Sequence, residues 1–188
     1  MSRYYKWIAG AGVAVLIAAS LTLLEQRHKA ESAPVTAPSS NPAADRIHEL
    51  KALEQDLQKK PEHPPILFRM AQLSTEMGKT ADAISLLQRL LKADAGNTEA
   101  RLELGRLLYE TNDLQGSIRE TSKILETNPK HVDALYNLGA IYANLNQPAL
   151  ARTFWNRAVA SAPGSESGKR AADGLQKLES QAASAVHP

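Results

Sequence analysis

Apolar side chains recur every three or four positions over much of this chain, which is the spacing of helices that bury one face. From residue 64 the pattern divides into three successive units of equal length, at 64–97, 98–131 and 132–165. Each unit contains two amphipathic segments with a break between them, which indicates two helices joined by a turn. The pattern therefore predicts an all-α protein with a helical hairpin repeated three times.

Four kinds of residue keep the same spacing of 34 positions, which is the repeat period: small residues, large apolar residues, Gly or Asn, and Pro. Small residues lie where two helices must approach closely, and Gly or Asn lies between them, where a left-handed conformation ends a helix. Pro129 and Pro163 stop the second helix of their units, because proline cannot continue a helix. The recurring sets are Ala71, Gly105 and Gly139; Ala83, Ser117 and Ala151; Met70, Leu104 and Leu138; and Gly78, Asn112 and Asn146.

An amphipathic segment at 45–61 precedes the three units. A lone repeat cannot bury its hydrophobic face, so a stack of repeats usually ends in additional helices. Pro61 lies two repeat periods before Pro129, which gives this segment the register of a second helix without its first. We expect it to pack on the first unit, and a short coiled-coil dimer through 45–60 is the alternative. Its apolar stripe consists of Ile47, Leu50, Leu53 and Leu57.

A second flanking segment, 166–183, follows the third unit and precedes a short tail at 184–188. Its small and apolar residues lie on one stripe at helical spacing, and its polar residues lie opposite. We expect a capping helix that closes the stack. The stripe consists of Ala171, Leu175, Leu178 and Ala182.

The amino-terminal segment, residues 1–30, contains an uncharged run from Trp7 to Leu24. As a helix this run rises about 27 Å, which is enough for the hydrocarbon layer of a bilayer. It predicts one transmembrane helix, a membrane anchor. A cleaved signal peptide is the alternative, since Ala18 and Ala19 are small, but the apolar run continues beyond them.

The residues around this run suggest where the repeats lie. The amino-terminal tail is very short, so we expect it to stay in the cytoplasm as in signal anchors, with the large carboxyl part exported. Residues 31–44 are rich in Pro, Ser and Ala, which is typical of a linker that holds a domain off the bilayer. This layout is common in bacterial envelope proteins and predicts a single-pass inner-membrane protein with a periplasmic domain.

The repeated unit resembles the tetratricopeptide repeat, whose signature places Leu-Gly and Tyr in the first helix and Ala, an aromatic residue and Pro in the second. The second unit departs from the signature at Arg101 and Thr121, and the first departs at Ser74 and Ala95. The resemblance implies an α-solenoid of stacked hairpins over 64–165. The third unit matches best, through Leu135, Leu138, Gly139, Tyr142, Ala151, Trp155, Ala158 and Pro163.

Composition and motifs argue against several kinds of chemistry. The chain has no cysteine, so disulfides, thiolate zinc sites and thiol nucleophiles are excluded. Its formal charge is 22 minus 20, or +2, and the part after residue 31 balances 18 basic against 18 acidic residues, which gives no footprint for nucleic acid. No phosphate-binding loop, nucleophile elbow or metalloprotease motif occurs. We predict no enzyme, no metal site and no cofactor.

In the family that this chain resembles, the first helices of the repeats line a concave groove. Helical spacing then selects the side chains that face the groove, and Arg106 is expected to offer a planar donor to a carboxylate or a backbone carbonyl. Packing between neighbouring repeats is the alternative role for each of these residues, while Tyr142 and Trp155 are expected in the core. The predicted partner-binding residues are Phe68, Gln72, Leu102, Arg106, Tyr109, Tyr136 and Asn144.

Some tetratricopeptide co-chaperones grip a terminal carboxylate with a clamp of lysine and asparagine. The matching places here hold Phe68, Gln72 and Glu103, so that clamp is absent. We therefore expect a membrane-tethered scaffold that binds a protein or peptide partner mainly through apolar and hydrogen-bond contacts and recruits it to a cell-envelope complex. A structural component that forms homo-oligomers through the repeats or through 45–60 is the alternative.

Overall fold

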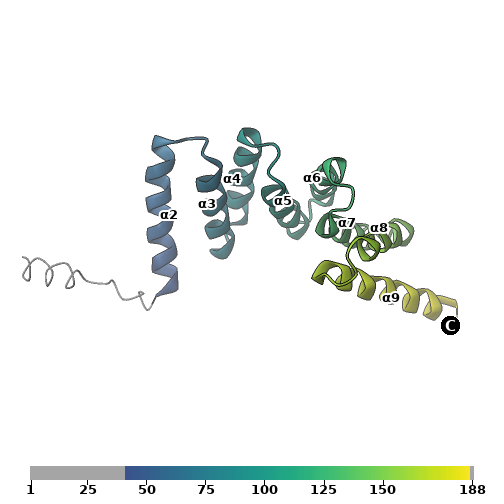
Figure 1. The fold of residues 1–188 in the computed structure, drawn as a ribbon. Coiled ribbons are helices and arrows are strands. Elements are labelled where there is room, and N and C mark those ends of the chain that lie inside the picture. Colours follow the sequence, from purple (N-terminus) through teal and green to yellow (C-terminus); the bar gives the residue numbers. More distant parts are fainter. Residues whose placement is uncertain (1–40, 187–188) are drawn as a thin grey trace, which may run out of the picture. The chain divides into compact units, whose positions relative to one another are not determined.

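The computed structural model describes residues 41–186, with side chains through residue 182. Every regular element in this range is an α-helix (Figure 1), which confirms the predicted all-α fold class. The helices are α2 Pro42–Lys59, α3 Pro64–Glu76, α4 Thr80–Ala93, α5 Thr98–Glu110, α6 Leu114–Thr127, α7 Val132–Asn144, α8 Pro148–Ser161 and α9 Glu166–Val186.

The predicted membrane anchor at 7–24 lies outside the described residues, as does most of the predicted linker. Between residues 41 and 186, no helix combines the length and the apolar character needed to cross a bilayer. The expected linker boundary at residue 44 is wrong, because α2 already begins at Pro42. Asn41 explains the early start, since its side-chain oxygen accepts hydrogen bonds from the amides of Ala43 and Ala44 and so caps the helix.

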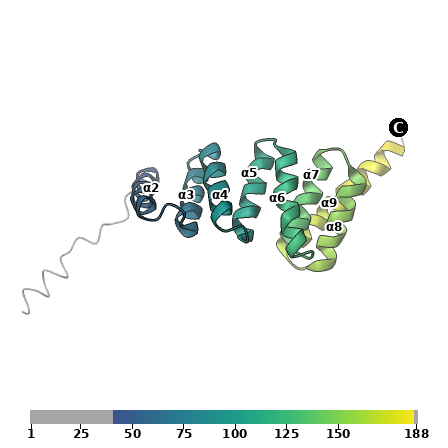
Figure 2. The same ribbon diagram turned by 90° about the horizontal axis from the view of Figure 1, so that it is seen from above.

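The helices pair as successive hairpins, α3 with α4, α5 with α6 and α7 with α8 (Figure 2). Each hairpin also packs on the next one, through α4 with α5 and α6 with α7. The first helices begin at Pro64, Thr98 and Val132, each one repeat period after the last. After the last hairpin, α9 packs on both α8 and α7. The hairpins and α9 therefore form one continuous stack of helices.

The turn inside each hairpin depends on a residue in the left-handed region. Gly78 has a φ of 73°, Asn112 a φ of 66° and Asn146 a φ of 55°. In each turn the amide that follows this residue donates to a carbonyl five positions earlier, as in the bond of 2.8 Å from Lys79 N to Ser74 O. This geometry satisfies a carbonyl at the helix end, which confirms the predicted role of the Gly and Asn positions.

The first helices from α5 onward begin in the same way, and α9 continues the series. Asn97, His131 and Ser165 follow one another at the repeat period, and each side chain accepts a hydrogen bond from the backbone amide three residues later. Such caps satisfy amides that have no partner within the helix. The repeat period therefore extends through the start of α9.

Two hydrophobic clusters hold the stack together. The first joins α3, α4 and α5 around Leu67, Leu87 and Leu104. The second joins α7, α8 and α9 around Trp155, which is 7% exposed and donates from Nε1 to the carbonyl of Tyr136 at 3.1 Å. Its ring lies where a side chain on Gly139 would project, so this position requires glycine. The expected core placement of Trp155 is confirmed.

Helix α2 is attached more weakly than the others, and it contains no buried residue. Leu57 packs on the first cluster, and Glu49 accepts from Arg69 through both oxygens, at 2.6 and 2.9 Å. The hydrogen bond from Arg69 lowers the pKa of Glu49, against a smaller opposing effect of desolvation. Both side chains are 42% exposed, so solvent screens the pair and it contributes little to stability.

Candidate functional site

The main candidate site is a cavity of about 370 Å³ between first helices of neighbouring repeats. Helices α5 and α7 supply most of its lining, and α9 supplies one arginine. Two tyrosine rings, two arginines and a glutamate give it both apolar and charged surface. The lining residues are Gly105, Arg106, Tyr109, Glu110, Ser117, Tyr136, Asn137, Ala140, Ile141 and Arg170.

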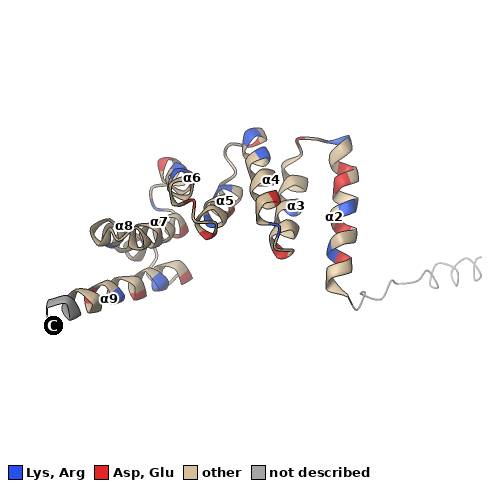
Figure 3. Cartoon of the chain, turned by 180° about the vertical axis from the view of Figure 1, so that it is seen from behind, with Lys and Arg blue, Asp and Glu red and all other residues tan. Residues whose placement is uncertain are grey.

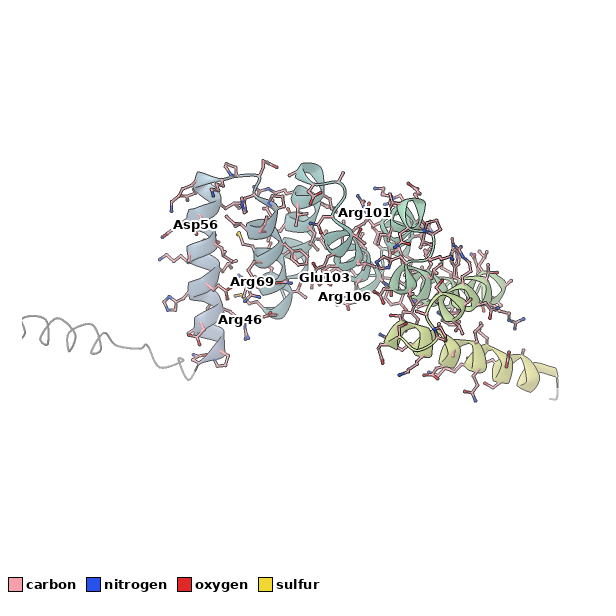
Figure 4. All side chains as sticks on the ribbon, in the orientation of Figure 1. Arg46, Asp56, Arg69, Arg101, Glu103 and Arg106 are labelled. Carbon is pink, nitrogen blue, oxygen red and sulfur yellow. The ribbon has the colours of Figure 1, made fainter. Side chains whose placement is uncertain are left out.

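Arg106 lies in this cavity, but its guanidinium group is occupied by its own helix. Glu103 accepts from Arg106 Nε at 2.9 Å and from Nη2 at 2.5 Å, and Glu110 accepts from Nη1. Figure 4 shows Glu103 and Arg106 together on α5. The hydrogen bond to Glu103 is the largest of the effects that raise the pKa of Arg106. Three N–H groups of Arg106 are thus engaged within α5, and its expected role as a planar donor to a partner stays a prediction.

The two tyrosines connect the cavity walls. Tyr109 comes from α5 and Tyr136 from α7, and both rings are partly buried. Asn144, near the end of α7, donates from its amide nitrogen to the hydroxyl of Tyr109 at 3.3 Å. Tyrosine rings provide a rigid apolar area with a polar tip, which suits the binding of a peptide side chain. These three residues were predicted groove residues, and the structure brings them together.

Arg170 completes the cavity and was not among the predicted groove residues. Its guanidinium carbon lies 4.5 Å from the centre of the Tyr136 ring, which is a cation–π distance. Arg170 itself is exposed, and among the described side chains no carboxylate forms an ion pair with it. Its donors therefore stay available to a ligand, in contrast to those of Arg106.

A signal for Arg170 is present in the sequence. It lies one repeat period after Tyr136, just as Ser167 lies one repeat period after Asp133, and the Ser167 hydroxyl donates to the Asp133 carboxylate. The groove positions predicted from the sequence ended at Asn144, and 166–183 was expected only to cap the stack. Because α9 keeps the repeat period, its residues at groove positions lie on the same face of the stack as the groove residues of the first helices.

The other predicted groove residues lie away from this cavity. Phe68 is partly buried and packs against the first hydrophobic cluster. Gln72 accepts a long hydrogen bond of 3.4 Å from Arg69, a neighbour on the same helix. Leu102 is half-buried on α5 and is not part of the cavity lining. The structure thus concentrates the candidate site at α5, α7 and α9, with Arg106, Tyr109, Tyr136 and Asn144.

A second cavity, of about 540 Å³, lies among α4, α5 and α6 and contains an ion pair with little exposure. Arg101 donates to Glu120 at 2.6 Å, and the two side chains are 12% and 16% exposed. Arg101 also donates to the carbonyl of Ala95. This arginine occupies the place where the repeat signature has a large apolar residue, so its bonds explain how the second repeat tolerates the departure.

Charges of both signs are interleaved along the helices, most plainly on α2 and α9 (Figure 3). Within the described part of the chain, no three His, Cys, Asp or Glu side chains are grouped so that they could hold a metal ion. The cavity between α5, α7 and α9 therefore remains the strongest candidate site.

Residues 74–153 of the chain belong to the tetratricopeptide repeat family. Two sequence models of the family, each described as tetratricopeptide repeat, match residues 74–124 and 121–153. Solved structures of tetratricopeptide repeat proteins also share the fold. Proteins of this family are generally scaffolds without catalytic activity of their own.

One relative is the probable UDP-N-acetylglucosamine–peptide N-acetylglucosaminyltransferase SEC of Arabidopsis thaliana. It is 32% identical over 68 residues, which are 36% of this chain and 7% of that protein. The match is therefore confined to a small part of the relative, and the enzyme's activity does not transfer with it.

Two solved structures illustrate the shared fold. YrrB, described as a tetratricopeptide protein with an unusual peptide-binding site, gives a TM-score of 0.62 at 22% identity over 69% of this chain and 67% of its own. The first tetratricopeptide domain of Spaghetti, bound to the HSP90 peptide SRMEEVD, gives 0.58 at 17% identity over 64% of this chain and 93% of its own. At these identities the likeness shows the fold alone.

Proposed function

We propose that this protein is a membrane-tethered scaffold that binds a peptide segment of a partner protein between α5, α7 and α9. The observation that carries the proposal is the cavity of about 370 Å³, in which two tyrosine rings offer apolar area and an arginine that pairs with no described carboxylate offers hydrogen-bond donors. The peptide-binding site named for YrrB and the peptide bound to Spaghetti support the use of this fold for such binding.

The proposed tether is the apolar run from Trp7 to Leu24, followed by the linker rich in Pro, Ser and Ala. A tether confines the repeats to a thin layer beside the bilayer and raises their concentration near other envelope proteins. Even a modest affinity of the cavity for its peptide would then suffice for recruitment. We place the anchor in a bacterial inner membrane and the repeats in the periplasm, where they recruit the partner to an envelope complex.

Site-directed photo-crosslinking in cells tests the binding proposal. A photo-reactive amino acid replaces Asn144, which is exposed and donates to the hydroxyl of the cavity residue Tyr109, and in a control chain it replaces Leu150, which is exposed on α8. We expect an adduct from position 144 that position 150 does not give and that Tyr109→Ala abolishes. If both positions gave the same adducts, the cavity would not be the binding site.

Membrane topology is tested separately by protease treatment of sealed inner-membrane vesicles with the cytoplasmic face outward. The proposal expects the repeats to be protected until detergent is added. Digestion of the repeats in intact vesicles would place them in the cytoplasm and would contradict the envelope assignment, while leaving the binding site unaffected.

Self-association is a second candidate function, favoured by the exposure of α2. Ile47 is 54% exposed, so this end of the apolar stripe is open to a second copy, whereas Leu57 at the other end packs on the first cluster. Sedimentation of the full chain in mild detergent distinguishes the two candidates. A concentration-dependent dimer that Ile47→Glu abolishes would support self-association, and a monomer at all concentrations would remove it.

A further inference from the structure

We propose that the cavity between α5, α7 and α9 selects a peptide with two opposite charges, an acidic side chain held by Arg170 and a basic side chain held by Glu110. This inference rests on the proposed peptide binding and adds the chemistry and the direction of the bound segment. The two charged groups lie on different walls of one cavity, so they define which end of the peptide meets which helix.

The α9 wall, formed by Arg170, carries the positive charge. The guanidinium carbon lies 4.5 Å from the centre of the Tyr136 ring, and this contact fixes the position of the group. A planar guanidinium presents several donors at once and matches a carboxylate in a bidentate geometry. Since no described carboxylate pairs with Arg170, a ligand carboxylate is the group that would complete this wall.

The α5 wall contains Arg106 and Glu110, and together with Glu103, which pairs with Arg106 beside the cavity, these groups carry an excess of negative charge. Two carboxylates share one guanidinium, which leaves one negative charge uncompensated within the cluster. Glu103 takes two bonds from Arg106 and is 25% exposed, whereas Glu110 is 50% exposed and accepts only one. Glu110 therefore has free acceptor capacity for an ammonium or guanidinium group from a ligand.

The surface between the two walls is apolar and aromatic. Tyr109, Tyr136 and Ala140 line it, and the cavity volume of about 370 Å³ limits the segment to a few side chains. An apolar or aromatic side chain between the charged positions of the peptide would cover the tyrosine rings. The same surface discriminates against a peptide whose charges are reversed, because like charges would then meet at both walls.

A phage-displayed library of random dodecapeptides, selected on the purified full chain in mild detergent, tests this inference. The peptides are joined to the phage coat at their carboxyl ends, so an enriched acid is a side chain and not a terminal carboxylate. We expect the wild type to enrich peptides with an acidic and a basic residue at fixed spacing around an apolar residue. Arg170→Glu should replace the acidic preference by a basic one, and Glu110→Lys should replace the basic preference by an acidic one.

Binding of one enriched peptide, measured by fluorescence anisotropy, gives the size of the effect. Arg170→Glu should weaken it about tenfold or more, because a charge-assisted hydrogen bond is lost and a repulsion replaces it. Arg170→Lys should keep the acidic preference with weaker binding, since it retains the charge and loses the planar fork. Loss of the preference in Arg170→Lys as well as in Arg170→Glu would mean that Arg170 only positions Tyr136, and would overturn the inference.

Arg157→Glu is the matched control, because Arg157 also stacks on an aromatic ring, at 5.5 Å from the centre of Phe154, but lies outside this cavity. It should leave the enriched sequences unchanged, and a shift equal to that of Arg170→Glu would overturn the inference. Enrichment of wild-type binders without the two charged positions would overturn the inference and leave the proposed peptide binding intact. If the wild type enriches no peptide, the proposed peptide binding fails as well.

Discussion

The two helices that flank the repeats differ in how they join them. α9 keeps the repeat period, since its cap Ser165 follows His131 by one period and its Ala171 is fully buried beside Trp155. α2 contains no buried residue; Leu57 packs on the first cluster, and an exposed ion pair joins Glu49 to Arg69. Both segments are amphipathic in sequence, so amphipathic character alone does not decide how a flanking helix packs.

The sequence register of α2 explains why this helix buries no residue. Shifted by one repeat period, the positions of Ala83 and Leu90 in α4, which are both fully buried, correspond to Glu49 and Asp56 in α2. A carboxylate at such a position cannot be buried without a partner, because the cost of desolvating a charge is several kcal/mol. Figure 4 labels Asp56 on α2, where it pairs with Lys59 in solvent. α2 therefore has the period of a second helix but not its buried residues.

At the carboxyl end, the preserved repeat period brings α9 into both the core and the candidate site. A helix that keeps the register contributes to the core on one side and to the cavity on the other, as Ala171 and Arg170 do. α9 is thus part of the candidate site as well as a cap. A sharper comparison of the two ends follows from four substitution experiments.

The largest expected effect is that of Trp155→Ala, which removes the ring that joins α7, α8 and α9. The loss of a buried aromatic side chain should lower the free energy of unfolding by about 3–5 kcal/mol. Urea unfolding followed by far-ultraviolet circular dichroism measures it. Leu57→Ala, the matched change at the α2 end, should cost clearly less, and equal costs would show that the two ends are attached alike.

The next experiment gives α2 the buried residues that it lacks. The double substitution Glu49→Ala with Asp56→Leu places apolar groups where α4 has Ala83 and Leu90. It should raise the free energy of unfolding by about 1 kcal/mol, because burying one leucine contributes about 1.5–3 kcal/mol and losing the exposed pair of Glu49 with Arg69 costs about 0.2–1 kcal/mol. Amide hydrogen exchange across 46–59 should slow in parallel. Unchanged exchange would mean that the carboxylates are not what keeps α2 at the surface.

Removal of the helix caps should have an effect of similar size, but an asymmetric one. Ser165→Ala removes the acceptor for the amide of Gly168 and should lower the free energy of unfolding by about 1 kcal/mol, because α9 unfolds with the stack. Asn41→Ala should fray the start of α2 and leave global unfolding unchanged. Equal decreases in urea unfolding for both variants would contradict the weak attachment of α2.

The smallest effect concerns pH. Because Arg69 lowers the pKa of Glu49 below the ordinary 4.5, the pair stabilises the docked α2 above that pH, and this contribution is lost as the pH falls through the lowered pKa. The pair is exposed, so we expect about 0.2–1 kcal/mol. Hydrogen exchange of α2 between pH 6 and pH 3 (approximate limits set by the ordinary carboxyl pKa) should show it. In Glu49→Gln this pH dependence should be absent.

Much of the site could be anticipated from local spacing. Glu103 and Glu110 lie three and four residues from Arg106, a spacing at which side chains on a helix meet. The ion pairs of Arg106 with these two residues could therefore be predicted from the sequence. Tyr109 and Tyr136 were identified by helical periodicity, and they line the cavity. Phe68 satisfied the same periodicity but packs on a hydrophobic cluster, because periodicity selects a face and not a cavity.

The hairpins follow from local sequence, since each depends on contacts within one repeat and on Gly78, Asn112 or Asn146 at its turn. Local backbone preferences and the apolar period act in every repeat, and their agreement leaves one way to fold it. The packing of α9, in contrast, places the guanidinium of Arg170 over the Tyr136 ring, where no described carboxylate pairs with it. The reason is that the ring and the cation come from different helices, whose approach depends on the packing of α9 on α7 and α8.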